Sequence, residues 1–269
     1  MVALKKPVGA ITRGTTNPNR LRRIDRYLTQ LSFLRNLPSP LAVDLGYGKT
    51  PVTAVELLAR LEKVAPGIRV LGIEIDPARV SEAKALEHSR LAFEHGGFEV
   101  PIPKVFSDRT DVDLIRALNV LRQYSESEVE SAWALMQSRL SESGLIIEGT
   151  SDEIGRVASW ITLDKSHPIS FTISLRLQGL DRPSKVAERL PKILIHKNTH
   201  GNKIHQYLQD LDKAWDKAAG FGAFGSAQRF VQTAKTLLQA GWPIDNSPKR
   251  WRLGELTISY EAISPSHPN

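Results

Sequence analysis

The stretch LAVDLGYGKTP, residues 41–51, decides the fold of this chain. An apolar run over residues 41–46 ends in a glycine, and Thr50 and Pro51 are typical of the N-cap and first residue of a helix. Glycines between a strand and a helix let the backbone approach a ligand closely, and the helix N-terminus adds a positive dipole. The sequence therefore predicts a ligand-binding turn between a strand and a helix.

The spacing of the glycines disfavours two ligand classes. A phosphate-binding P-loop needs a glycine five positions before Gly48, and Val43 stands there. A dinucleotide-binding fingerprint needs a glycine three positions after Gly48, and Pro51 stands there. What remains is Asp44, two residues before Gly46. In a phosphate-binding loop this acid would repel the ligand.

The residues that follow alternate between short apolar runs and longer runs of helical period. We expect strands over residues 69–75, 112–118 and 145–150, and a weaker one within 91–100. Helices are expected to begin at Thr50-Pro51, at Asp76-Pro77 and at the capping box of Ser125 and Glu128. The first has Val55, Leu58 and Leu61 inward, the second continues through Ala92, and the last ends at Gly144. Strands that alternate with helices imply a mostly parallel sheet covered on both faces.

The flanking regions are less regular. Upstream, Asn17-Pro18 predicts a helix with Leu21, Ile24, Leu28 and Leu31 inward. Downstream we expect strands over 171–177 and 255–262, helices over 203–219 and 226–240, and loops over 178–203 and 219–226. No composition shift marks a linker. We therefore predict an N-terminal helical extension or lid over residues 1–39 and one domain over residues 40–264.

The segment Asp44-Leu45-Gly46-Tyr47-Gly48 resembles the first motif of class I S-adenosylmethionine-dependent methyltransferases. Thr50 departs from that pattern, because the family usually has a third glycine there. The resemblance covers residues 40–150. It implies an α/β, Rossmann-like fold with a seven-stranded, mostly parallel sheet, one antiparallel strand and helices on both faces. It also implies S-adenosylmethionine as the cofactor, with its methionine end held by Asp44, Gly46, Tyr47 and Gly48.

A second acid strengthens this resemblance. In LGIEIDP, residues 71–77, Glu74 and its neighbour Ile75 lie near the strand end, where the family places an acid on the ribose hydroxyls. A carboxylate has two acceptor oxygens and can take both hydroxyls at once. A solvated acid at a strand end is the other interpretation of Glu74. Asp76, two residues on, is typical of a helix cap.

Two further segments are placed by the resemblance. DVDLIRALNVLRQY, residues 111–124, looks like the fourth-strand motif of the superfamily, particularly that of chemotaxis-receptor methyltransferases. Asn119 would then lie against the cofactor; a cap of the junction between strand and loop is the alternative. Gly97 and Phe98 follow the third strand, where the adenine would lie. Phe98 either stacks on the adenine or is a plain core residue.

Candidates for chemistry outside these motifs are fewer. Asp152 and Glu153 follow the strand over 145–150 and are candidate general bases or substrate contacts, although surface acids after a strand are common. The basic run from Arg13 to Arg26 either binds an acidic substrate or RNA phosphates, or is a solvated helix face. We expect no metal site, since His196, His200 and His205 have no acidic ligand close by in the sequence.

Composition limits the class of protein. The 269 residues, 41% of them apolar and 24% charged, are typical of a globular protein with a sizeable core. The chain has no cysteine, which excludes disulfides, thiolate metal sites and a cysteine nucleophile. No apolar run reaches the roughly 18 residues of a membrane span, and the N-terminal apolar stretch is too short for a secretory signal. We therefore expect a cytoplasmic protein without a membrane partner.

The sequence thus predicts an S-adenosylmethionine-dependent methyltransferase that acts on a small-molecule acceptor. RNA is a second candidate partner, which a net charge of +7 over 269 residues permits but does not favour. The alternative function is a catalytically inactive, basic binding module that keeps this fold and takes RNA or an acidic ligand. The sequence leaves the methyl acceptor and the oligomeric state open.

Overall fold

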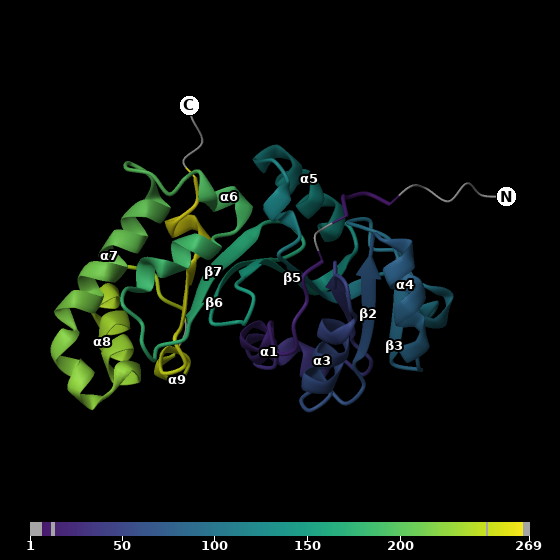
Figure 1. The fold of residues 1–269 in the computed structure, drawn as a ribbon, viewed down its shortest axis with the longest axis horizontal. Coiled ribbons are helices and arrows are strands. Elements are labelled where there is room, and N and C mark those ends of the chain that lie inside the picture. Colours follow the sequence, from purple (N-terminus) through teal and green to yellow (C-terminus); the bar gives the residue numbers. More distant parts are fainter. Residues whose placement is uncertain (1–6, 12–13, 246, 266–269) are drawn as a thin grey trace. The chain divides into compact units, whose positions relative to one another are not determined.

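The computed structural model, drawn in Figure 1, describes residues 7–11, 14–245 and 247–265. Arg13, the start of the predicted basic run, and residues 266–269 lie outside these ranges. The chain divides into two compact units. The first runs to Glu148 and also holds residues 153–155 and 164–167, and the second holds residues 149–152, 156–163 and those from Pro168 onward.

Parallel strands form the centre of the first unit. They are β1 (Leu41–Leu45), β2 (Arg69–Glu74), β3 (Leu91–His95), β4 (Val112–Leu118) and β5 (Leu140–Ser151), whose last three residues fall in the second unit. The order is β3-β2-β1-β4-β5, and the pairs β3-β2, β2-β1 and β1-β4 are parallel. Every residue of β1 and β4 is buried, as expected of a sheet covered on both faces.

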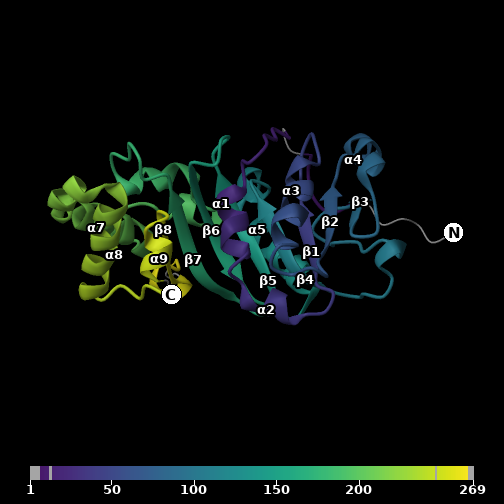
Figure 2. The same cartoon turned by 90° about the horizontal axis from the view of Figure 1, so that it is seen from below.

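Two helices precede these strands and the others lie between them. They are α1 (Arg22–Leu28), α2 (Ser32–Asn36), α3 (Val52–Leu61), α4 (Pro77–Ala83) and α5 (Glu126–Gln137), with the short 3₁₀ helices η1 (Lys84–Leu86), η2 (Lys104–Phe106) and η3 (Leu121–Gln123). Helix α5 begins at the predicted capping box, in which Glu128 accepts from the backbone N–H of Ser125 at 2.7 Å. Helix α1 contacts α3, and Figure 2 shows the two side by side.

The second unit is built differently. Its strands β6 (Val157–Leu163), β7 (Pro168–Leu175) and β8 (Glu255–Ser259) pair antiparallel in that order. The helical elements are η4 (Pro183–Arg189), α6 (Lys192–Ile195), α7 (Lys203–Lys217), η5 (Ala219–Phe224), α8 (Ser226–Gln239), α9 (Pro248–Trp251) and η6 (Tyr260–Ala262). Helices α7 and α8 pack together, and the guanidinium of Arg229 in α8 lies 3.8 Å from the ring centroid of Trp215 in α7.

The α/β class and the mostly parallel arrangement are confirmed, but the predicted number of strands is wrong. The described residues contain eight strands rather than seven. The additional strand, β6, was not predicted, because all seven of its residues are buried and its sequence lacks the alternation of a half-exposed strand. The second unit contains two antiparallel pairs, β6-β7 and β7-β8, where one antiparallel strand was expected.

Three local predictions also differ from the structure. Helix α3 starts at Val52 with Pro51 as its N-cap, and Thr50 makes no cap; Val55 is 38% exposed because Ala54, Leu57, Leu58 and Leu61 face inward. Helix α4 ends at Ala83 rather than at Ala92, because residues 91–95 form β3. Gly144 does not end α5, which stops at Gln137. Gly144 lies inside β5, which begins at Leu140. The strand begins there because the carbonyl of Arg139 accepts from Val112 N at 2.9 Å, which draws the chain to the start of β4.

Candidate functional site

The loop after β1 has the shape that its glycines predict. Gly46 (φ +69°) and Gly48 (φ +88°) both adopt the left-handed backbone conformation. A Cβ on Gly46 would lie 2.7 Å from Cγ2 of Val120, and one on Gly48 would lie 2.4 Å from Oγ1 of Thr16. Because both the backbone angle and the space exclude a side chain, glycine is required at each position.

Glu74, at the end of β2, fixes this loop. Its side chain is 1% exposed, and Oε2 accepts from the backbone N–H of Gly48 at 2.9 Å. The other oxygen accepts from Ile75 N at 3.0 Å and Asp76 N at 3.2 Å, and Nη1 of Arg79 lies 3.5 Å away. A carboxylate oxygen has about two lone-pair sites, so Oε2, which of these donors takes only Gly48 N, keeps capacity for one further donor.

Asp44, the acid of β1, belongs to a buried cluster of charges. Its carboxylate accepts from Nε of Arg116 at 3.0 Å and from Oγ1 of Thr53 at 2.6 Å. Arg116, which is fully buried in β4, also pairs with the buried Asp25 of α1, and Arg60 of α3 pairs with Asp25 in turn. The cluster therefore balances the charge of Asp44 inside the protein and ties β1 and β4 to α1 and α3.

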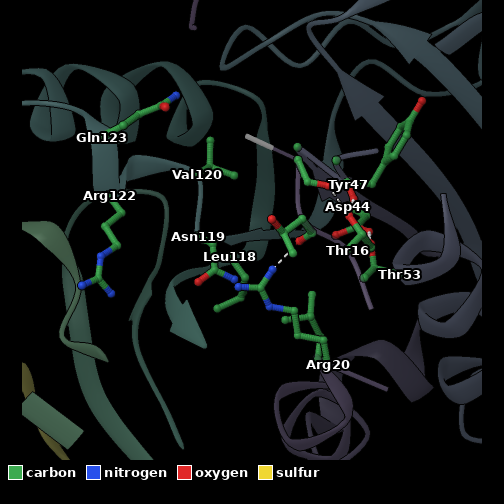
Figure 3. A pocket seen from close by; sticks show the side chains of 15 residues that line it. Thr16, Arg20, Asp44, Tyr47, Thr53, Leu118, Asn119, Val120, Arg122 and Gln123 are labelled. Carbon is green, nitrogen blue, oxygen red and sulfur yellow. Dashed lines mark hydrogen bonds between the residues drawn. The ribbon is translucent and has the colours of Figure 1, made fainter. Parts of the chain in front are cut away.

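A cavity of about 480 Å³ opens beside the glycine loop. Its walls come from three segments of the first unit: residues 14–21, the region from Asp44 to Thr53, and residues 118–123. Asp44, Gly46, Tyr47, Gly48 and Asn119, all predicted to hold the cofactor, line it together. Figure 3 shows Arg20 pointing toward Asn119, with Arg122 and Gln123 across the cavity from Asp44 and Thr53.

Tyr47 and Asn119 contribute to this cavity in different ways. The ring of Tyr47 is buried edge-on to Phe93, with centroids 5.4 Å apart, and burial raises the pKa of its phenol. Its backbone carbonyl faces the N-terminal region and accepts from Thr16 Oγ1 at 2.9 Å. Asn119 is half-buried with φ +65°, a conformation that asparagine tolerates better than most residues. The turn alone can therefore account for an asparagine at this position.

The residues predicted for the nucleoside end gather at a second, much smaller cavity. Glu74, Ile75, Gly97 and Phe98 line a space of about 20 Å³ on the other side of Gly46. Phe98 is buried and meets Tyr124 edge to face, with centroids 5.4 Å apart. Residues 8–10 form another part of its lining.

The two predicted catalytic acids lie elsewhere. Asp152 accepts from the backbone N–H of Arg156 at 2.7 Å and so stabilises the turn after β5. Glu153 is exposed, and its backbone carbonyl accepts from Asn17 Nδ2 at 3.1 Å. Neither is among the residues that line the two cavities. A catalytic role for Asp152 or Glu153 stays a prediction.

Several residues at the site were not predicted. Thr16, Arg122 and Gln123 line the larger cavity, and Arg116 supports it from β4. Arg20, which also lines it, belongs to the basic run from Arg13 to Arg26 that was a candidate for an acidic ligand. The unusually polar stretch TRGTTNPN, residues 12–19, was the signal for Thr16. An arginine within the apolar run VDLIRAL was the signal for Arg116, because a buried arginine requires an acidic partner.

Within the described ranges, no helix has the length and apolar character needed to cross a bilayer. In the same part of the chain, no cluster of three or more His, Asp or Glu side chains could hold a metal ion. His205, which lies in α7, is 3.1 Å from Asn198 Oδ1 through its Nδ1.

No protein-family model matches this chain, and no curated protein matches it. Similar solved structures include human N-acetylserotonin methyltransferase in complex with S-adenosylmethionine (21% identity, 47% of this chain and 36% of that one, TM-score 0.32). Magnesium protoporphyrin IX methyltransferase from Synechocystis PCC 6803 with bound S-adenosylmethionine is similar at 18% identity over 48% of this chain and 56% of that one, TM-score 0.36. Many of the neighbours are S-adenosylmethionine-dependent methyltransferases. This chain covers less than two thirds of the length of those just described.

Proposed function

We propose that this protein is an S-adenosylmethionine-dependent methyltransferase that acts on a small-molecule acceptor. The observation that carries the proposal is the loop of Gly46 and Gly48, left-handed at both glycines and tied by Gly48 N to the strand-end carboxylate of Glu74. In open parallel sheets, ligands bind at the carboxyl ends of the strands, where this loop, Glu74 and Asn119 all lie.

The larger cavity fits the amino-acid end of this cofactor. Asp44 lines it as the acid for an ammonium group, although Arg116 shares the charge of that carboxylate. Arg20 and Arg122 line it as well, and a guanidinium is the group best suited to a carboxylate. Both charges of an amino-acid end therefore meet an opposite charge there.

The residues that line the smaller cavity suit a nucleoside. In this conformation, however, the cavity is too small to hold one. Glu74 and Ile75 would contact the ribose, and Gly97 and Phe98 the adenine. A volume of about 20 Å³ does not hold an adenosine, because a space of this size admits only about one water molecule. The nucleoside end fits only if residues 8–10 leave.

S-adenosylmethionine, when bound, supplies a methyl carbon made electrophilic by the neighbouring sulfonium. The residues of the chain would then act by positioning, with the glycine loop, Asn119, Arg20 and Arg122 holding the cofactor so that its methyl group faces the acceptor. Asp152 and Glu153 are the proposed proton acceptors for an acceptor that carries a proton. Residues 1–39 are the proposed lid of a methyltransferase-like domain over residues 40–264.

A second candidate is a basic binding protein that keeps this fold without methyl transfer. The filled nucleoside half of the site favours it, since a site that never admits the cofactor would look like this. The net charge of +7 permits an acidic ligand or RNA for such a protein.

Calorimetry with S-adenosylmethionine, S-adenosylhomocysteine and NAD tests the proposal. We expect the first two to bind and NAD not to bind. Gly48→Ala should weaken binding, because its Cβ would meet Thr16 Oγ1 at 2.4 Å. Gly179→Ala is the matched control, since Gly179 is also left-handed (φ +73°) but has open space around it. Binding of NAD in place of S-adenosylmethionine, or equal binding by the Gly48→Ala and wild-type proteins, would contradict the proposal.

A further inference from the structure

Residues 7–11, here called the strap, lie in the nucleoside half of the site (purple, Figure 1). The strap contacts this half of the site through its backbone N–H and C=O groups. The carbonyl of Val8 accepts from Phe98 N at 3.0 Å, and Val8 N donates to Oε2 of Glu99 at 2.9 Å. Two residues on, Ala10 N donates to the phenol oxygen of Tyr124. The strap is therefore held by hydrogen bonds to the wall of the small cavity.

Glycines on both sides make this approach possible. A Cβ on Gly9 would lie 3.2 Å from Cδ1 of Ile75 and 3.2 Å from the phenol oxygen of Tyr124, and Gly9 has a φ of +148°. A Cβ on Gly97 would lie 2.0 Å from the carbonyl oxygen of Val8. The strap and the cavity wall are thus in contact at a distance that admits no other group between them.

The strap uses the same surfaces that the proposed function assigns to adenosine. Ile75, Gly97 and Phe98 contact its backbone, and the N–H of Phe98, a donor suited to an acceptor on a base, is occupied by Val8. We propose that the strap is an internal competitor, which occupies the nucleoside half and leaves it when S-adenosylmethionine binds. The inference rests on the proposed function.

The contacts of the strap suit a segment that detaches. Val8 is 44% exposed and Ile11 is 59% exposed, so its apolar side chains point to solvent and contribute little burial. The segment is held by backbone hydrogen bonds near the surface, which belong to the parts of a protein that open most easily. The amino-acid half, in contrast, stays open at about 480 Å³.

Competition has a measurable consequence for affinity. A ligand that binds only the strap-free state has an apparent Kd raised by the inverse of the fraction of molecules in that state. A substitution that weakens the strap without touching the cavity wall must therefore tighten the binding of a nucleoside ligand. The same substitution must not change the affinity for a ligand that occupies only the amino-acid half.

Gly9→Val in the full chain is the sharpest test, because a valine at Gly9 would collide with Ile75 and Tyr124 while the wall of the cavity stays intact. We expect S-adenosylhomocysteine and adenosine to bind at least tenfold more tightly than to the wild type. Methionine should bind both proteins equally. Gly220→Val is the matched control, since nothing lies within 4 Å of a Cβ there.

A second variant weakens the strap from the other side. Gln123→Ala removes the donor to the carbonyl of Ala10, a bond of 3.2 Å. Because Gln123 also lines the amino-acid half, the ligand for this variant is adenosine, which should bind more tightly than to the wild type. Gln137→Ala is its control, because it removes a similar bond of 3.0 Å to the carbonyl of Asp164, away from the site. Amide hydrogen exchange of residues 8–11 should rise when the wild type is saturated with S-adenosylhomocysteine.

The outcomes separate this inference from the proposed function. If wild type and Gly9→Val bind S-adenosylhomocysteine equally, and the amides of residues 8–11 keep their protection in the complex, the strap is no competitor and the proposed function stands. If neither protein binds S-adenosylmethionine, S-adenosylhomocysteine or adenosine, the proposed function fails and the inference fails with it.

Discussion

The carboxyl ends of β1 and β2 each carry a buried acid, but the two acids have different kinds of partner. Asp44 of β1 is bound by side chains, those of Arg116 and Thr53. Glu74 of β2 is bound mainly by backbone N–H groups, among them that of Gly48. Loss of a side-chain cluster releases whole elements from one another, whereas loss of a backbone anchor releases one loop. We therefore expect Asp44 to matter most for stability and Glu74 most for the site.

Arg116→Met tests the first half of this comparison and has the largest expected effect. It removes the cation between Asp25 and Asp44 and leaves both carboxylates buried without it. Removing one partner of a buried ion pair typically costs about 3–5 kcal/mol, and we expect that loss in urea denaturation. Arg69→Met is the control, because its partner Asp108 is largely exposed and such pairs contribute about 0–1 kcal/mol. Equal losses in the two variants would refute the role of the cluster.

Glu148 sharpens the comparison, because it is a buried acid that no arginine or lysine pairs with in the described residues. Burial raises the pKa of Glu148 to about 8. The neighbouring indole of Trp133 lowers this pKa, but by less than burial raises it. Between its ordinary value of 4.5 and about 8, the unfolded chain releases this proton and the folded protein keeps it. Stability that is present below pH 4.5 is therefore lost as the pH rises toward 8.

Glu148→Gln should abolish that loss. At pH 9 the variant should be more stable than wild type by a few kcal/mol, since each unit of pKa shift corresponds to about 1.4 kcal/mol. Thermal melts at pH 5 and pH 9 measure the difference. Glu142→Gln, on the same strand but exposed, is the control and should follow the wild type at both values. A wild type whose stability is the same at pH 5 and pH 9 would show that Glu148 is not the buried neutral acid described above.

Glu74→Ala tests the second half of the comparison. It removes the acceptor of Gly48 N and of Ile75 N, and hydrogen bonds to charged groups contribute roughly 1.5–3 kcal/mol each. We expect S-adenosylmethionine to bind at least about tenfold more weakly in calorimetry, because 1.4 kcal/mol is one decade in Kd. Glu74→Gln, which keeps the shape but loses the charge, should fall between. Unchanged affinity in both variants would remove Glu74 from the site.

Asp76→Ala has the smallest expected effect and separates the acid of the loop from the acid of the helix. Asp76 is the N-cap of α4, and its Oδ1 accepts from Ala78 N at 2.9 Å, as its position in the sequence predicted. Loss of a cap typically costs about 1 kcal/mol of stability. We expect the melting temperature to fall slightly and the Kd for S-adenosylmethionine to stay the same. If Asp76→Ala weakens binding while Glu74→Ala does not, the ribose acid is Asp76.

The sequence by itself determined the elements over residues 40–150 and the conformation of the glycine loop. Strand β4 has its predicted bounds, and the capping box of Ser125 and Glu128 forms as expected. These features depend on residues a few positions apart, since periodicity, caps and left-handed glycines are local properties of the chain. The fully buried strand β6 gave no such local pattern and was missed.

Only the tertiary structure decided which groups satisfy the two strand-end acids and what lies in the nucleoside half of the site. Arg116 and Asp25 are 91 residues apart, and so are Val8 and Glu99. Neither pair has a local signature, because hydrogen bonds and charge balance across such separations depend on the path of the chain as a whole. The sequence could place acids and glycines at a cofactor site, but the position of the strap within that site followed from the packing alone.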